Sequence, residues 1–176
     1  ERAYDPKEER VWAFHARAKY LLEGLRPLHL FQATATGLLL EGNRVVGVRT
    51  WEGPPARGEK VVLAVGSFLG ARLFLGGVVE EAGRLSEASY PDLYEDLEAL
   101  GFRFVEREGP VPDPPPPPGH RVPYLPFHPG EWEVGAFRLK RLEGLYAVGL
   151  CVREGDYARM SEEGQRLAEH LLHELG

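Results

Sequence analysis

The stretch Val61-Val62-Leu63-Ala64-Val65-Gly66-Ser67-Phe68-Leu69 decides the fold. Its first five residues form an uninterrupted apolar run, which is typical of a β-strand that other elements cover on both faces. Gly66 ends this run. Gly144-Leu145-Tyr146-Ala147-Val148-Gly149 is a second short apolar run bounded by glycines. Because buried strands of this kind occur in parallel sheets with helices packed on them, the two segments predict an α/β protein.

A helix is expected at each end of the chain. The N-terminal helix begins at Asp5-Pro6-Lys7-Glu8, where Asp5 is the predicted cap and proline suits the first helical position. The C-terminal helix continues from Tyr157 and is interrupted at Gly164. Both contain apolar side chains at three- and four-residue spacing, which marks one helix face. In the N-terminal helix these are Val11, Phe14, Ala18, Leu21, Leu22 and Leu25.

Between these two helices the pattern predicts strands and one further helix. Leu28 to Ala33 is short and apolar, and is predicted as a buried strand. Residues 37–41 and 44–50 flank Gly42-Asn43, a turn sequence typical of a β-hairpin. Ser89-Tyr90-Pro91-Asp92 predicts the start of a helix that ends at Gly101.

Residues 110–129 hold ten prolines, five of them consecutive at positions 114–118. Such a segment is stiff and extended and forms a core poorly. We interpret it as a surface excursion and not as a domain boundary, with a docking site for a proline-binding partner as the alternative. Residues 1–176 are therefore expected to form a single α/β domain.

Composition excludes several classes of protein. Hydrophobic residues make up 43% and charged residues 27% of the chain, a balance typical of a folded, soluble domain. No apolar run is long enough to cross a membrane, and the first ten residues lack a signal core, so we expect a cytoplasmic protein. The net charge of −6 argues against a broad nucleic-acid-binding face. One Asn, two Gln and one Met are typical of a thermophilic source.

Few side chains stand out as candidates for catalysis or metal binding. His170 and His173 have a spacing that could present two metal ligands, but they also suit the negative end of a helix, and no metal site is predicted. Cys151 cannot form an internal disulfide because it is the single cysteine. It could be a nucleophile if a neighbouring cation such as Arg153 lowered its pKa, although a half-buried apolar role is the commoner one for a free cysteine.

The glycines that follow the two apolar strands offer the best indication of a binding site. In open α/β sheets, ligands bind beyond the carboxyl ends of the strands. Glycine lets a ligand approach the backbone closely there. Gly155-Asp156 then opens a helix, whose first N–H groups can hold a negative group.

In these features the chain resembles the flavoproteins of the two-dinucleotide-binding class. Within that class it resembles the glucose-inhibited division protein A family, FAD-dependent enzymes that modify the wobble uridine of tRNA, and most of all a small relative of that family. The resemblance is carried by Phe31-Gln32 with the hairpin after it, by residues 61–69, and by residues 144–149 with Tyr157 and Gly164.

The resemblance implies a Rossmann-like FAD/NAD(P)-binding three-layer fold with an antiparallel hairpin insert. The family's G-x-G-x-x-G motif has no counterpart in the sequence, so the chain is expected to lack the N-terminal βαβ unit and to form a partial domain. No catalytic residue is assigned. The residues that the resemblance assigns to FAD are, from the adenine to the flavin ring, Thr34, Ala35, Ala64, Val65, Gly66, Ser67, Gly149, Leu150, Asp156, Tyr157, Ala158 and Arg159.

Three functional interpretations remain open at this point. The first is an FAD-binding flavoprotein related to tRNA modification, an oxidoreductase if it is an enzyme, with tRNA or a protein as a weak partner. The second is a non-enzymatic binding or assembly module that keeps the flavoprotein fold. The third is an NAD-dependent enzyme, which is disfavoured because an acidic residue to bind the ribose would belong to the missing N-terminal unit.

Overall fold

The computed structural model describes residues 11–84, 87–109 and 120–175. The chain divides into two compact units, residues 1–33 and residues 34–176.

The first unit contains the helix α1 (Val11–Glu23), as the apolar spacing predicts. The predicted cap at Asp5 lies outside the described residues. The strand predicted at Leu28–Ala33 is wrong: this segment has no strand geometry, and Phe31 is 79% exposed. A strand needs a neighbour to satisfy its backbone hydrogen bonds, and none of the described strands pairs with this segment.

The second unit begins with the predicted hairpin, which is confirmed. Strands β1 (Ala35–Glu41) and β2 (Arg44–Thr50) pair antiparallel around Gly42, and β3 (Ala56–Arg57) extends this sheet. Gly42 has a φ of +62°, a conformation that favours glycine in a tight turn.

The helix predicted after Tyr90 is also confirmed and is α2 (Asp92–Ala99), which ends before Gly101. It packs on the hairpin through a polar contact, because the Asp96 carboxylate accepts a hydrogen bond of 2.8 Å from the Leu38 N–H. The same carboxylate pairs with Arg49 of β2. This contact joins α2 to both strands of the hairpin.

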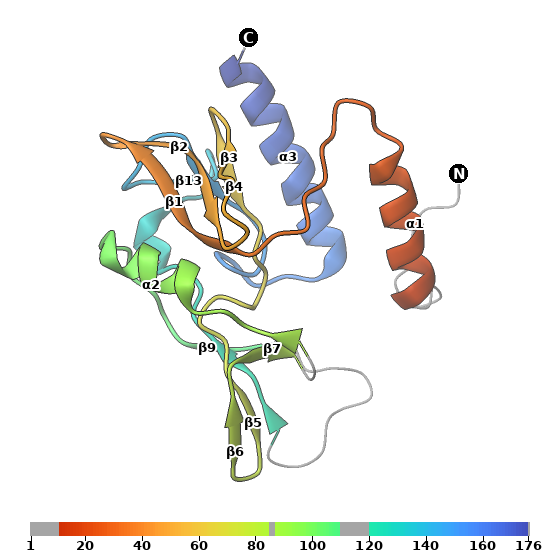
Figure 1. The fold of residues 1–176 in the computed structure, drawn as a ribbon, viewed down its shortest axis with the longest axis vertical. Helices are drawn as coiled ribbons and strands as arrows, with labels where there is room; N and C mark the ends of the chain where they lie inside the picture. Colours follow the sequence, from red (N-terminus) through yellow and green to blue (C-terminus); the bar gives the residue numbers. More distant parts are fainter. Residues whose placement is uncertain (1–10, 85–86, 110–119, 176) are drawn as a thin grey trace. The chain divides into compact units, whose positions relative to one another are not determined.

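The central sheet contains part of each apolar run, residues 61–63 and 145–147, and two of its strands, β4 (Val61–Leu63) and β13 (Arg138–Leu139), are labelled in Figure 1. Strand β4 pairs in parallel with β14 (Leu145–Ala147), and β13 and β12 (Trp132–Glu133) follow beyond β14. The predicted parallel sheet is therefore present as one parallel pair. Within the described residues β4 is the edge strand of this sheet, and Val62 is 38% exposed, so β4 is less covered than predicted.

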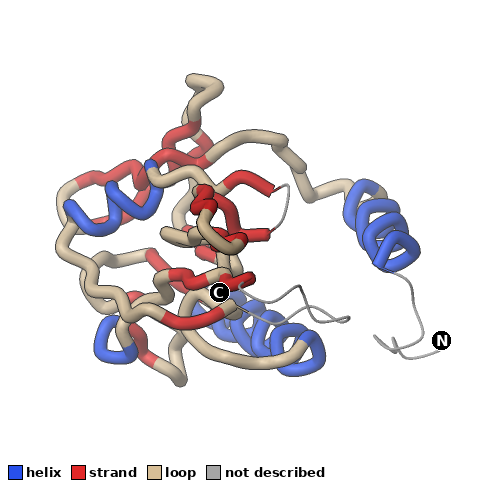
Figure 2. The backbone as a smooth tube through the Cα atoms, turned by 90° about the horizontal axis from the view of Figure 1, so that it is seen from below, coloured by secondary structure: helices blue, strands red, loops and turns tan. Residues whose placement is uncertain are grey.

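The rest of the second unit contains short strands joined by turns and loops (Figure 2). The sequence pattern does not predict these elements. The strands are β5 (Leu73–Leu75), β6 (Val78–Glu80), β7 (Ala82–Arg84), β8 (Glu87–Ala88), β9 (Arg107–Glu108), β10 (His120–Arg121) and β11 (Pro123–Tyr124), and the short 3-10 helix η1 (Pro129–Glu131) follows them. Tyr124 and Phe127 are fully buried, so the surface excursion predicted for 110–129 is wrong for this part. Residues 110–119 lie outside the described residues.

The last element is the helix α3 (Tyr157–Leu175), which runs without a break through Gly164, contrary to prediction. It packs against the central sheet: Leu167 belongs to the hydrophobic core, and the His170 ring lies 6.3 Å from the Tyr146 ring of β14. These contacts outweigh the low helix propensity of one glycine, which amounts to about 1 kcal/mol.

The helices and the mixed sheets confirm the α/β class. None of the helices in the described part of the chain is long and apolar enough to cross a membrane.

Candidate functional site

The parallel pairing of β4 with β14 brings two of the predicted cofactor segments together. Leu145 lies opposite Val61 and Ala147 opposite Leu63, so both strands end at the same edge of the sheet. The Val148 N–H donates a hydrogen bond of 3.1 Å to the Leu63 carbonyl at that point. We call the residues that follow, 64–67 and 148–151, the carboxyl edge.

The carboxyl edge presents unsatisfied backbone donors. Gly66 and Gly149 have φ values of +62° and +84° and turn the chain sharply at the end of each strand. Among the described residues, the N–H groups of Gly66, Ser67, Gly149 and Leu150 have no hydrogen-bond acceptor. A Cβ built on Gly66 meets no atom within 4 Å, so the space above this backbone is open. Clustered N–H groups of this kind form a concave site for an anion.

Asp156 begins α3 as its N-cap, as the sequence analysis predicts for a helix start. Its carboxylate accepts a hydrogen bond of 2.9 Å from the Arg159 N–H, and its carbonyl accepts one of 3.0 Å from the Met160 N–H. The side chains of Asp156, Ala158 and Arg159 are exposed. The start of α3 therefore carries a positive dipole end with one of its free N–H groups capped.

Thr34 and Ala35, the residues predicted at the adenine, lie at the start of the hairpin. The Thr34 N–H donates to both carboxylate oxygens of Glu52, at 3.1 and 3.2 Å, and its carbonyl accepts from the Trp51 N–H. Ala35 pairs with Thr50 in the sheet. The backbone hydrogen-bonding groups of Thr34 are therefore already engaged, which leaves apolar contact as the way this segment could meet a ring.

Cys151 lies inside the carboxyl edge as a structural residue. It is fully buried, and its thiol lies 3.3 Å from the Val148 carbonyl and 3.5 Å from the Leu63 carbonyl. Burial raises the pKa of Cys151 to about 12, so the thiolate that a nucleophile needs is absent at neutral pH. The structure supports the apolar role, because the side chain is fully buried in the core, against the ends of both strands.

Glu163 is a buried carboxylate beside the start of α3 that the sequence analysis does not identify. Its Oε1 accepts a hydrogen bond of 2.7 Å from Arg153 and lies 3.6 Å from Arg159, while its Oε2 has no partner among the described residues. Glu163 therefore holds two guanidinium groups beside the carboxyl edge. The four-residue spacing of Arg159 and Glu163 on one helix is the signal that could have revealed part of this cluster.

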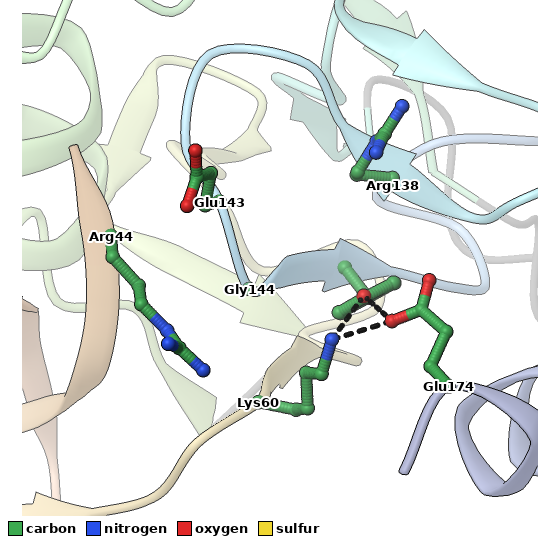
Figure 3. A pocket seen from close by; sticks show the side chains of 7 residues that line it. Arg44, Lys60, Arg138, Glu143, Gly144 and Glu174 are labelled. Atoms are coloured by element: carbon green, nitrogen blue, oxygen red, sulfur yellow. Dashed lines mark hydrogen bonds and ion pairs between the residues drawn. The ribbon is translucent and has the colours of Figure 1, made fainter. Parts of the chain in front are cut away.

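A pocket of about 290 Å³ lies at the opposite edge of the same strand pair (Figure 3). Lys60 and Gly144 directly precede β4 and β14, so we call it the amino-edge pocket. Its lining comes from five separate segments of the chain, and for that reason no local motif predicts it. The lining residues are Arg44, Lys60, Arg138, Glu143, Gly144, Tyr146 and Glu174.

Three of these residues form a closed hydrogen-bonded cluster. The Lys60 ammonium donates to the Tyr146 hydroxyl at 3.1 Å and to the Glu174 carboxylate at 2.5 Å, and Tyr146 donates to the same carboxylate oxygen. These hydrogen bonds lower the pKa of Glu174 to about 2, and the bond to Glu174 raises the pKa of Lys60. Both groups are therefore charged at neutral pH, and they fix the last turn of α3 to the sheet.

The two histidines of α3 do not share a ligand site. His170 lies 3.1 Å from the Glu174 carboxylate, within the cluster described above, whereas His173 is exposed. Within the described ranges, no three His, Cys, Asp or Glu side chains come together as metal ligands.

Comparison with known proteins identifies the family of this chain. A family model described as "Glucose inhibited division protein A" matches residues 8–112. The tRNA uridine 5-carboxymethylaminomethyl modification enzyme MnmG of Chlamydia muridarum is 42% identical over 89 residues, 51% of this chain and 15% of that protein. MnmG of Syntrophobacter fumaroxidans is 45% identical over 85 residues, 48% of this chain and 13% of that protein. The chain thus spans about one seventh of these curated relatives.

Solved structures agree with the family model. The GidA-related protein from Thermus thermophilus is 90% identical, with a TM-score of 0.88 over 98% of this chain and 74% of that chain. GidA of Aquifex aeolicus is 14% identical, with a TM-score of 0.75 over 88% of this chain and 48% of that chain, which shows a shared fold. Since the family model matches more than half of the 176 residues, the chain belongs to the glucose inhibited division protein A family.

Proposed function

We propose that the chain binds FAD at the carboxyl edge and belongs to a cytoplasmic flavoprotein that acts in the modification of the tRNA wobble uridine. The observation that carries this proposal is the group of four unbonded N–H donors at the ends of two adjacent parallel strands. A pyrophosphate needs such donors, and strand ends in α/β sheets are where dinucleotides bind. Family membership, and the relatives that modify tRNA uridine, support the second half of the proposal.

The proposal assigns the residues of the carboxyl edge to different parts of FAD. In this arrangement Ala64–Ser67 would lie along the adenosine and pyrophosphate, and Gly149 and Leu150 near the pyrophosphate and the ribityl chain. The open space above Gly66 leaves room for phosphate oxygens close to the backbone. Thr34 and Ala35 would contact the adenine through apolar atoms.

The start of α3 would serve the flavin ring. Asp156, Tyr157, Ala158 and Arg159 would line the pyrimidine edge, where the helix dipole and the Arg159 guanidinium favour negative charge. The Glu163 carboxylate would keep the Arg159 and Arg153 guanidinium groups in place through its ion pairs with them. When bound, FAD supplies hydride transfer, while these residues supply position and electrostatics.

The decisive experiment compares two glycines of the same conformation. Gly66 and Gly42 both have a φ of +62° and open space around a built Cβ, but Gly42 lies in the hairpin turn, which contributes no residue to the carboxyl edge. Gly66→Val and Gly42→Val should therefore lower the free energy of unfolding by similar amounts, about 1–3 kcal/mol, because both strain the backbone. FAD affinity, measured by flavin fluorescence, should fall at least about tenfold for Gly66→Val and stay constant for Gly42→Val.

The absolute affinity is expected to be weak in these 176 residues, because they contain no G-x-G-x-x-G motif. The same pair of substitutions at the matching positions of the longer Thermus relative repeats the comparison where more of the fold is present. Equal FAD affinity of the two variants in both proteins would overturn the assignment. A purified protein without flavin absorbance that also ignores added FAD would favour the non-enzymatic assembly module.

A further inference from the structure

The amino-edge pocket contains charges that the protein does not neutralise. Lys60 and Glu174 pair with each other, and Arg138 pairs with Glu133 at 2.7 Å. Within the described residues, the Arg44 side chain forms no ion pair or hydrogen bond, and neither does the Glu143 carboxylate. The close-up shows the Arg44 guanidinium extending toward Lys60, while the Glu143 carboxylate turns away from it (Figure 3).

The position of Arg44 follows from the backbone around it. Arg44 is the first residue of β2 and forms a parallel bridge with Glu143, next to Gly144. The Val45 N–H and the Glu143 N–H donate to carbonyls across this bridge, at 2.9 and 3.0 Å. The backbone of Arg44 is therefore fixed beside the pocket, and its side chain is one of those that line it.

Lys60 keeps a donor for a ligand. An ammonium group has three N–H bonds, and the cluster uses two of them, toward Tyr146 and Glu174. The third has no partner among the described residues, and the Arg44 guanidinium, which also lines the pocket, carries five donors. Together Arg44 and Lys60 offer a fork and a point charge, the two donor types that proteins use for phosphate.

We propose that the amino-edge pocket binds a small phosphate monoester of a sugar, with Arg44 and Lys60 holding the phosphate and Glu143 accepting a hydrogen bond from a hydroxyl group of the sugar. A phosphate monoester carries about −1.5 to −2 charges at pH 7 and can accept hydrogen bonds both from the unpaired Arg44 guanidinium and from the remaining N–H of Lys60. Carboxylates bind sugar hydroxyls in the same way elsewhere. The volume of about 290 Å³ suits a small ligand.

The charge of the surroundings disfavours a nucleic-acid backbone as the occupant. The chain has a net charge of −6, and two carboxylates, Glu143 and Glu174, line the pocket beside the cations. A polyanion would meet this charge along its whole length, whereas a single phosphate group can bind at Arg44 and Lys60 and turn its sugar toward Glu143. The pocket also lies at the edge opposite the proposed FAD site, so the two proposals stand on different residues.

Calorimetric titration of the full 176-residue chain with ribose 5-phosphate and with inorganic phosphate tests this proposal. Arg44→Gln should weaken binding of both compounds about tenfold or more, because it removes a charged, forked donor. Arg57→Gln is the matched control, since Arg57 is exposed on the adjacent strand β3 and does not line the pocket. It should change the affinity less than about twofold.

Two further variants locate the ligand. Glu143→Gln should leave inorganic phosphate bound at least as tightly, because a negative charge is lost, and should reduce the preference for ribose 5-phosphate over phosphate. Gly66→Val, at the carboxyl edge, should leave the binding of both compounds unchanged. Circular dichroism of each variant checks that the fold is kept.

Several results would overturn the proposal. No binding up to about 10 mM ligand would exclude a phosphate site of useful affinity. An equal loss in Arg57→Gln would assign the effect to general surface charge, and a loss in Gly66→Val would move the ligand to the carboxyl edge. An unchanged ligand preference in Glu143→Gln would exclude the sugar contact. Displacement of ribose 5-phosphate by an RNA oligonucleotide that lacks terminal phosphates would assign the pocket to RNA.

Discussion

Glu131 is a buried carboxylate whose two oxygens both accept hydrogen bonds from guanidinium groups. It is 3% exposed and receives hydrogen bonds from Arg103 at 2.7 Å and from Arg141 at 2.6 and 2.9 Å. Burial raises the pKa of Glu131, but the hydrogen bonds from Arg141 and Arg103 outweigh burial and leave the pKa below its usual value. The carboxylate therefore remains charged and holds η1 and the loop after β13 together.

Removing this charge should destabilise the protein measurably. Glu131→Gln removes the negative charge and replaces one acceptor oxygen by an NH2 donor that faces a guanidinium, so we expect it to lower the free energy of unfolding by about 1–3 kcal/mol in urea denaturation. Glu133→Gln is the control, because the Glu133–Arg138 pair is exposed and should contribute under about 1 kcal/mol. Equal losses in the two variants would contradict the role given to burial.

Cys151 should not react with thiol reagents while the protein is folded. Since burial raises its pKa to about 12, a thiol reagent at pH 8 meets neither a thiolate nor an accessible sulfur. We expect labelling only at the rate at which the protein opens, and immediate labelling in urea. Rapid labelling of the native protein would show that the ends of β4 and β14 separate easily.

The helix α3 contains a position at which another residue would make the protein more stable than the natural glycine does. Gly164 lies inside the helix without a positive φ, and a Cβ built on it meets nothing within 4 Å. Gly164→Ala should therefore raise the free energy of unfolding by about 0.5–1 kcal/mol, because alanine loses less conformational entropy in a helix. Gly101→Ala should do the opposite, since its φ is +84°; thermal melting of both variants checks the pair.

The elements that the sequence predicts correctly are those whose signals are local. The hairpin has the turn sequence Gly42-Asn43, and the helix α2 has a start sequence at residues 89–92 and a stop at Gly101; both form. Leu28–Ala33 carries only apolar character, and a strand also needs a partner, which a linear pattern cannot show. The two- and three-residue strands between Leu73 and Leu139 are too short to display a period.

The residues of the candidate site also fall into those with a local sequence signal and those without one. Gly66, Gly149 and Asp156 follow from strand ends and a helix cap, and the structure places the two glycines at one edge of the sheet. Part of the Glu163 cluster has a local signal in the four-residue spacing from Arg159. The amino-edge pocket has none, because its side chains come from distant segments that meet only after packing.

For the whole molecule, the carboxylates with lowered pKa values set the acid limit of stability. Glu174 has its pKa lowered to about 2, and Glu131 is also lowered, so each contributes stability above the unfolded value of about 4.3. That contribution should be lost as the pH falls from about 4.5 toward 2. The midpoint of urea unfolding followed across this range should drop less steeply in Glu174→Gln than in the unchanged protein, and parallel curves would contradict the assignment.

The net charge of −6 sets an expectation for tRNA. Any affinity of this chain for tRNA should be weak and should fall steeply between about 50 and 200 mM salt, because phosphate contacts dominate such complexes. Filter binding at the two salt concentrations measures this. A tight complex that tolerates the higher salt would show that the chain carries a specific tRNA surface.

The parallel pairing of β4 with β14 also determines how the protein reaches its native state. Lys60 and Tyr146, which meet at this pair, are 86 positions apart in the sequence, so a long loop must close before the pair can form. Contacts at such separation slow folding, whereas the hairpin β1–β2 can form early and alone. The N–H donors of the carboxyl edge lie at one end of the β4–β14 pair, and the amino-edge pocket lies at the other. Both sites are therefore complete only after this pair has formed. A ligand at either edge should therefore slow unfolding more than it speeds folding.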